Sequence, residues 1–145
     1  MLKLVGMGGT FDHLHDGHKL LLDTAFSLCE EVHIGLTNEK MLRRKRHAAK
    51  LEDYETREKN LGAYISTIAD LDRVKIFELD NPYGPPVNDP AYDGIVVSQE
   101  TFMGALQIND IRVEKGYPPI IIVVVPLVMG KEGVRISSTA IREKI

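Results

Sequence analysis

Residues 8–18 read Gly-Gly-Thr-Phe-Asp-His-Leu-His-Asp-Gly-His, a stretch rich in glycine and histidine between two apolar segments. The segment before it, Leu2 to Val5, is short, apolar and closed by glycines, which is typical of a buried strand. The segment after it, Lys19 to Cys29, is longer and largely apolar, which predicts a helix. We therefore take the turn between this first strand and first helix as the candidate site.

The residue types in this turn suit a phosphate group. A helix start exposes unpaired N–H groups and the positive end of the helix dipole, and Gly8, Gly9 and Gly17 permit close approach of the backbone. His15 and His18 are three residues apart, so both imidazoles can donate hydrogen bonds to one bound group. Taken singly these signals are weak, because glycine pairs are common in turns and a lone histidine is more often a surface residue. Their combined order makes chance a poor explanation, and the spacing matches neither a P-loop nor the Rossmann dinucleotide motif.

A second signal lies near the end of the sequence. The run Ile120 to Val125 is almost entirely β-branched and predicts a strand, and residues 136–142 read Ile-Ser-Ser-Thr-Ala-Ile-Arg. Ser137 or Ser138 is a natural N-cap for a final helix. The same hydroxyls, with Arg142 one turn further on, also suit the phosphates of a nucleotide. Taken alone, this stretch favours an ordinary capped helix. Its occurrence together with the first motif favours a role in binding the phosphates of a nucleotide.

A basic run, residues 40–47, follows the predicted second strand, Val32 to Leu36. In a parallel sheet this run lies at the same edge as the first motif. A solvated basic loop, a nucleic-acid patch and a targeting signal are the alternatives. Because the protein is acidic overall, we favour phosphate capture, with Lys45, Lys40 and Arg43 as candidates in that order.

The remaining segments alternate between helix-like and strand-like patterns. They predict a helix over Tyr54 to Leu71, strands over Val74 to Leu79 and Gly94 to Val97, and a helix over Gln99 to Lys115 capped by Ser98 and ended by Gly116. This alternation predicts an α/β fold, a Rossmann-like parallel sheet with helices on both faces and ligands beyond the carboxyl ends of the strands. The 145 residues suffice for one domain, so we expect a single domain over residues 1–145.

Composition restricts the class of protein further. A net charge of -3 gives no overall attraction to nucleic acid or anionic membranes, and we expect neither as a partner. No apolar run approaches membrane-spanning length, and the first six residues lack the apolar region of a signal peptide. Cys29 is the single cysteine, and its apolar helical neighbours predict a buried, inert thiol. We therefore expect a cytoplasmic protein.

The motifs resemble those of a known group of enzymes. Residues 9–12 (Gly-Thr-Phe-Asp), 15–18 (His-Asp-Gly-His) and 136–142 are similar to the paired signatures of the nucleotidyltransferase superfamily, in which the first and last motifs close over one nucleotide triphosphate. The middle of the chain, residues 80–86 (Asp-Asn-Pro-Tyr-Gly-Pro-Pro), 89–90, 95–101 and 108–109, resembles the archaeal and eukaryotic phosphopantetheine adenylyltransferase family. This resemblance covers nearly the whole chain.

The resemblance implies a reaction and a set of residues. The family joins 4'-phosphopantetheine to ATP, giving dephospho-coenzyme A and pyrophosphate. By similarity, Thr10 holds the pantetheine phosphate and His15 and His18 bind the triphosphate, with His18 stabilising the transition state. Lys45 is a further catalytic candidate, and Lys40, Arg43 and Lys45 join Thr10 on the substrate. The implied nucleotide-binding set is Gly9, Thr10, Phe11, His15, His18, Asn109, Ser137, Ser138, Thr139 and Arg142. For Asn109, a solvated helix face is the safer interpretation.

The chemistry expected is positioning and electrostatic stabilisation. The acceptor phosphate is already an oxyanion and needs no general base, while charge develops at the α-phosphorus and on pyrophosphate. We expect Mg²⁺ to bridge triphosphate oxygens with few protein ligands, and no metal site of the protein's own. The bacterial form of this enzyme family has Arg-Gly-Leu-Arg after its fourth strand, whereas this chain has Ser-Gln-Glu-Thr at residues 98–101. Other groups must therefore supply the positive charge of those two arginines.

Two alternatives stay open at this point. One is a related transferase, either a cytidylyltransferase or an adenylyltransferase for a nicotinamide or flavin nucleotide. The cytidylyl pattern Arg-Thr-x-Gly-Ile-Ser-Thr-Thr differs from the sequence at residues 133–139. The other is a non-catalytic nucleotide sensor, although both histidines and the serine cluster of the motifs are present.

Overall fold

Strands and helices alternate along the chain. The computed structural model describes residues 1–39, 51–81 and 83–126. Its strands are β1 (Leu2–Gly9), β2 (Cys29–Thr37), β3 (Val74–Leu79), β4 (Gly94–Ser98) and β5 (Ile121–Val125). Its α-helices are α1 (Asp16–Leu28), α3 (Tyr54–Ile68) and α4 (Phe102–Glu114), and short 3-10 turns cover Leu71–Arg73 and Pro85–Val87.

The five strands form one sheet in the order β3-β2-β1-β4-β5, and every neighbouring pair is parallel. All carboxyl ends therefore lie at one edge. The chain runs outward from β1 through β2 to β3 and then returns to β4 on the other side of β1. This change of direction lies between β1 and β4, the place where parallel α/β sheets bind ligands.

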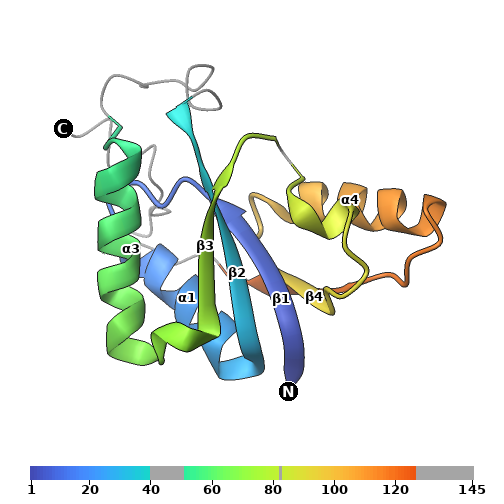
Figure 1. The fold of residues 1–145 in the computed structure, drawn as a ribbon, viewed down its shortest axis with the longest axis horizontal. Coiled ribbons are helices and arrows are strands. Elements are labelled where there is room, and N and C mark those ends of the chain that lie inside the picture. The colour runs from blue at the N-terminus through green and yellow to red at the C-terminus, as the bar shows by residue number, and fades with distance from the viewer. Residues whose placement is uncertain (40–50, 82, 127–145) are drawn as a thin grey trace.

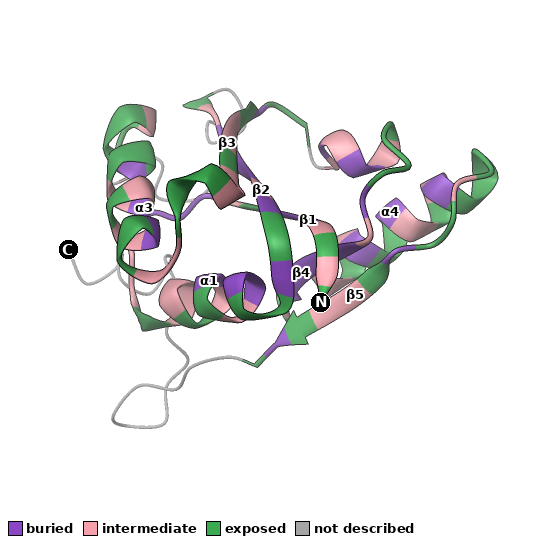
Figure 2. Cartoon of the chain, turned by 60° about the horizontal axis from the view of Figure 1, so that its bottom comes forward, coloured by how far each residue is buried: buried purple, intermediate pink, exposed green. Residues whose placement is uncertain are grey.

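Helices cover both faces of the sheet, as the sequence predicts. Helices α1 and α3 lie on one side and α4 on the other (Figure 1). The larger core cluster joins α1 and α3 to Val5, Val32 and Ile34, whereas the smaller one joins α4 to Ile95 and Val97. Buried residues recur along the helices and concentrate on β2 and β4 (Figure 2). The strands alternate between the two cores because successive side chains point to opposite faces.

Several predicted helix boundaries differ from the structure, including the start of α1 at Asp16 in place of Lys19 and the end of α3 at Ile68 in place of Leu71. Helix α1 ends at Leu28, and Cys29 is the first residue of β2, with extended backbone at φ -134° and ψ 147°. Cys29 is buried as predicted, but it does not lie in a helix, because α1 passes into β2 with no intervening loop. Helix α4 begins at Phe102, not Gln99, because Ser98 still pairs with Val125 in the sheet.

The cap of α4 also differs from the prediction. The N-cap residue is Thr101, not Ser98, and it makes no side-chain cap bond; residues 98–101 form a turn in which Thr101 N–H donates to Ser98 O at 3.2 Å. The predicted end is confirmed, since Gly116 follows the helix with a positive φ of 82°, a conformation that suits glycine. None of the helices within residues 1–39, 51–81 and 83–126 has the length and apolar character needed to cross a membrane.

Candidate active site

The start of α1 is held by the two histidines of the first motif. His15 is the N-cap residue, and its Nδ1 accepts a hydrogen bond from Gly17 N–H at 3.0 Å. His18, three residues on, accepts with Nδ1 from His15 N–H at 3.2 Å. The two bonds form a reciprocal capping box in which imidazoles replace the usual hydroxyl and carboxylate. The rings are stacked, with centroids 3.8 Å apart.

This geometry fixes the tautomers of both rings. A ring nitrogen that accepts a hydrogen bond carries no proton, so each neutral imidazole has its proton on Nε2. Burial lowers the pKa of His15, and burial together with the neighbouring His15 lowers the pKa of His18 to about 3. Both side chains are therefore neutral Nε2–H donors at pH 7. His15 Nε2 is buried and has no hydrogen-bond partner within the described part of the chain.

Thr10 lies at the carboxyl end of β1, where a buried arginine braces it. The Thr10 hydroxyl accepts a hydrogen bond from the Thr37 hydroxyl at 3.3 Å. Arg57, fully buried on α3, donates from Nη1 to Thr10 O at 3.1 Å and to Thr37 O at 2.8 Å. Its Nε donates to Glu52 O at 3.1 Å, and Glu39 lies 3.7 Å from Nη2. Arg57 therefore joins the ends of β1 and β2 to the start of α3.

The loop between β1 and α1 is tied to the segment before α3. Asp12 is fully buried and its Oδ1 accepts from Glu52 N–H at 2.8 Å, while Glu52 Oε1 accepts from His13 N–H at 2.7 Å. Phe11 and His13 both have positive φ, 49° and 47°, which non-glycine residues adopt at a cost in energy. These bonds hold the two residues in that conformation.

Other predicted site residues have packing roles in the structure. Phe11 is 3% exposed, with its ring centroid 5.3 Å from that of His18. A Cβ at Gly9 would lie 3.3 Å from the Phe11 ring, so the absence of a side chain at Gly9 makes room for this ring. Asn109 is half-buried on α4, so the expectation that it lies on a solvated helix face is wrong.

Both polar atoms of Asn109 bond Ile120, with Nδ2 donating to its O at 3.2 Å and Oδ1 accepting from its N–H at 2.7 Å. Ile120 precedes β5, so this side chain lies toward the amino ends of the strands, away from the two histidines. Its predicted contact with a nucleotide stays a prediction. Seven other predicted residues lie outside the described residues: Lys40, Arg43, Lys45, Ser137, Ser138, Thr139 and Arg142.

Four residues that brace the site are absent from the predicted site residues, although Asp12 lies within the first motif: Asp12, Thr37, Glu52 and Arg57. One signal was present for Arg57, because it is four residues before Leu61 and eight before Ile65 and thus on the apolar stripe of α3. An arginine on a buried stripe indicates buried acceptors. The partners of Arg57 are backbone carbonyls, which no residue pattern identifies.

Comparison with known proteins identifies the class of this chain. The cytidylyltransferase-like family model matches residues 7–144, from the middle of β1 onward. Among solved structures, a protein with unknown function from Archaeoglobus fulgidus superposes with a TM-score of 0.71 and 34% identity, covering 83% of this chain and 87% of that one. The family match places the chain in the cytidylyltransferase-like class. The parallel sheet, with a histidine-capped helix start beside its switch point, is consistent with that class.

Two curated relatives define the family within this class. Phosphopantetheine adenylyltransferase from Pyrococcus abyssi is 41% identical over 140 residues, which is 97% of this chain and 88% of that protein. The protein of the same name from Methanosarcina barkeri is 45% identical over 140 residues, covering 94% of this chain and 84% of that protein. The chain belongs to the phosphopantetheine adenylyltransferase family, as the sequence motifs predict.

Proposed function

We propose that this chain transfers the adenylyl group of ATP to 4'-phosphopantetheine, giving dephospho-coenzyme A and pyrophosphate. The full-length similarity to relatives bearing the name phosphopantetheine adenylyltransferase supports the choice of substrates. The observation that carries the chemistry is the pair of stacked, neutral imidazoles at the start of α1, whose Nε2–H groups are not used by the capping box. A helix start with two further N–H donors suits an anion whose charge grows during reaction.

The reaction is an in-line displacement at phosphorus. An oxygen of the acceptor phosphate attacks the α-phosphorus of ATP, the bond from that phosphorus to the bridging oxygen breaks, and pyrophosphate leaves with the electron pair. His18 and His15 donate to the phosphate oxygens on which negative charge grows. Thr10, held by Thr37 and Arg57, orients the acceptor phosphate. Neutral donors suit this task, because they stabilise the transition state without trapping the product as strongly as fixed cations would.

Mg²⁺ supplies charge neutralisation as part of the ATP complex in this proposal. Within the described ranges no group of three His, Cys, Asp or Glu side chains is placed to hold a metal ion, and we assign Mg²⁺ no protein ligand. The remaining proposed contacts are Lys40, Arg43 and Lys45 on the substrates and Ser137, Ser138, Thr139 and Arg142 on the nucleotide. A cytoplasmic location is part of the proposal.

The test is pyrophosphate release with matched donors and acceptors. The donors are ATP and CTP with Mg²⁺, and the acceptors are 4'-phosphopantetheine, nicotinamide mononucleotide, riboflavin phosphate and glycerol 3-phosphate. We expect release only with ATP and 4'-phosphopantetheine, together with dephospho-coenzyme A. Release with another pair would reassign the substrate, and ATP binding with no release in any pair would indicate a nucleotide sensor.

A further inference from the structure

The turn between β1 and α1 joins two groups of proposed substrate contacts. Thr10, before the turn, is proposed to orient the acceptor phosphate, and His15, after it, is one of the two histidines proposed for the nucleotide. The turn contains two residues with positive φ, Phe11 at 49° and His13 at 47°. Because non-glycine residues adopt such angles at a cost in energy, contacts from outside the turn must keep it in this conformation.

Glu52, a half-buried residue directly before the N-cap of α3, supplies these contacts. Its backbone N–H donates to Asp12 Oδ1 at 2.8 Å, and its side-chain Oε1 accepts from His13 N–H at 2.7 Å. The two bonds are reciprocal, because in each the side chain of one segment bonds the backbone of the other. They hold both sides of the peptide group between Asp12 and His13, and the orientation of this group sets the direction in which the chain leaves the turn.

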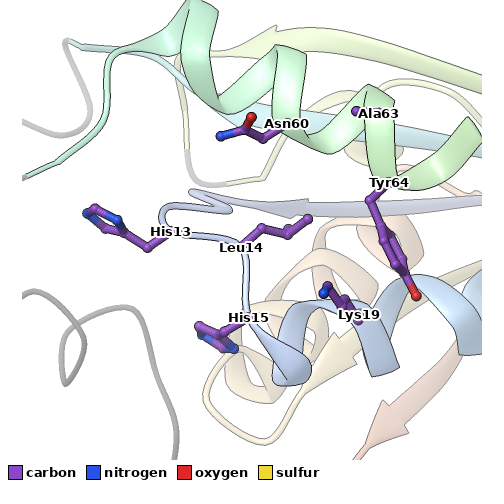
Figure 3. Close-up of a pocket in the computed structure, with 7 residues that line it drawn as sticks. All are labelled: His13, Leu14, His15, Lys19, Asn60, Ala63 and Tyr64. Atoms are coloured by element: carbon purple, nitrogen blue, oxygen red, sulfur yellow. The ribbon is translucent and has the colours of Figure 1, made fainter.

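The Glu52 residue is itself held from α3. Asn60 Nδ2 donates to Glu52 Oε2 at 3.4 Å, and Arg57 Nε donates to Glu52 O at 3.1 Å. His13, His15 and Asn60 line one cleft, and Figure 3 shows the turn and α3 as its two walls. Glu52 therefore sets the position of the turn relative to α3.

The charges around Glu52 are balanced by Arg57. Burial lowers the pKa of the Arg57 guanidinium, and the carboxylates of Asp12 and Glu52 are among the groups that oppose that shift. The positive charge of Arg57 thus lies near both carboxylates and offsets their mutual repulsion. The bond to His13 needs only an acceptor oxygen at the Oε1 position, which an amide supplies as well as a carboxylate. The contact made by Glu52 and its charge can therefore be tested separately.

We propose that Glu52 is a positioning residue for adenylyl transfer, which acts through the backbone of the turn to fix the separation between Thr10 and the two histidines. The inference rests on the proposed function. In that reaction an oxygen of the acceptor phosphate must lie in line with the bond that breaks at the α-phosphorus. Thr10 orients the acceptor and the histidines hold the phosphorus centre, so the turn between them sets their distance. A misplacement of about 1 Å can lower the rate by about 10².

The first test compares Glu52→Ala with Asp53→Ala in the steady-state kinetics of the full chain with ATP, Mg²⁺ and 4'-phosphopantetheine. Glu52→Ala removes the acceptor for His13 N–H, so kcat is expected to fall by about 10². The KM values of both substrates should change little, because each half of the site keeps its own contacts.

Asp53→Ala is the matched control for a loss of stability. Asp53 is the exposed neighbour of Glu52, and its Oδ1 caps α3 by accepting from Thr56 N–H at 2.8 Å. Its loss should lower the melting temperature and leave kcat near the wild-type value. Wild-type kcat in Glu52→Ala, or an equal loss of kcat in the two variants, would overturn the proposal.

Conservative variants separate the hydrogen bond from the charge. Glu52→Gln keeps an acceptor oxygen for His13 N–H and loses the charge, and Asn60 can turn its amide oxygen toward the new NH₂ group. This variant should keep most of the turnover. Glu52→Asp keeps the charge but is one methylene shorter, so its kcat should fall as in Glu52→Ala. Turnover in Glu52→Asp equal to or above that in Glu52→Gln would overturn the proposal, and this comparison decides the matter if Glu52→Ala does not fold.

Hydrogen exchange of the backbone amides gives a readout that does not depend on activity. Because His13 N–H is bonded to Glu52, its protection should be lost in Glu52→Ala and kept in Glu52→Gln and Asp53→Ala. Exchange of this amide in the wild-type chain as fast as in an unstructured peptide would show that the contact is absent in solution, and the proposal would fail.

The choice of acceptor separates this proposal from the proposed function. If pyrophosphate is released with another acceptor, the proposed function fails, but the loss of kcat in Glu52→Ala should persist with that acceptor, because it depends on the geometry of the turn. If 4'-phosphopantetheine is the acceptor and Glu52→Ala keeps its kcat, this inference alone fails.

Discussion

In the proposed mechanism, His15 and His18 each perform two tasks with one ring. The Nδ1 atoms hold the start of α1, and the Nε2–H groups are the donors proposed for the nucleotide. Deleting either ring therefore changes both the helix and the chemistry. A substitution that separates the tasks must keep an acceptor at the Nδ1 position and remove the donor at Nε2.

His18→Asn meets that requirement, since the asparagine oxygen can replace Nδ1 as the acceptor. We expect turnover to fall by about 10² or more, as for loss of one donor to a developing oxyanion. ATP affinity and the melting temperature should change little. The measurements are kcat, ATP affinity by calorimetry and thermal unfolding.

His18→Gln is the complementary control. Its amide nitrogen replaces Nε2 as a donor, and the cap acceptor is lost at about 1 kcal/mol of stability. This variant should unfold at a lower temperature yet keep more turnover than His18→Asn. Near-normal turnover in His18→Asn would remove His18 from the mechanism.

At the scale of elements, two fully buried arginines brace the two faces of the sheet. Arg57 bonds the carbonyls that end β1 and β2. Arg112, on α4, donates to the carbonyls of Pro86 at 2.6 Å and Asp89 at 2.8 Å, in the loop before β4. Both are 0% exposed and both bond backbone carbonyls, but only Arg57 adjoins Thr10.

This pair allows stability and substrate positioning to be separated. Lysine keeps the charge but cannot reach all the carbonyls, and leaving one or two buried acceptors unpaired costs about 2 kcal/mol or more. Arg57→Lys and Arg112→Lys should therefore both lower the melting temperature, by about 4–8 °C. Only Arg57→Lys should also raise the KM for 4'-phosphopantetheine, because Thr10 is no longer held. Equal KM values in the two variants would mean that Arg57 only stabilises the fold.

The elements themselves follow from local patterns. The β-branched and apolar runs predict the strands and apolar spacing predicts the helices, and β3 matches its predicted range from Val74 to Leu79. The errors at Cys29 and Ser98 arise where a helix and a strand adjoin with no glycine or proline between them. At such junctions the pairing of strands decides the boundary, and pairing joins residues far apart in the sequence.

At the scale of the whole molecule, the position of the first helix start is predictable from the sequence, and the contacts that brace it are not. The order of glycines and histidines in residues 8–18 locates the helix start, and the sheet topology then places it at the switch point. The bond from Glu52 N–H to Asp12, and those from Arg57 to Thr10 O and Thr37 O, join segments 20 to 47 residues apart. Such contacts depend on how α3 packs, which no local pattern encodes.

The buried imidazoles also make the stability of the whole chain depend on pH. His18 has a folded pKa of about 3, lowered from 6.5, so between these values the unfolded chain binds a proton that the folded chain does not. Stability therefore rises with pH across that window, is complete above about 6.5, and is lost as the pH falls toward 3. The lowered pKa of His15 acts in the same direction.

We expect the free energy of unfolding, measured by urea titration at several pH values, to fall more steeply below pH 6.5 in the wild-type chain than in His18→Asn. The carboxylates titrate in both proteins, so their contribution cancels in the comparison and the remaining difference belongs to His18. Parallel curves would show that His18 is protonated as readily in the folded chain as in the unfolded one. The ring would then be charged below about pH 6.5, where it could not accept from His15 N–H, so the capping bond and the neutral-donor mechanism could hold only above that pH.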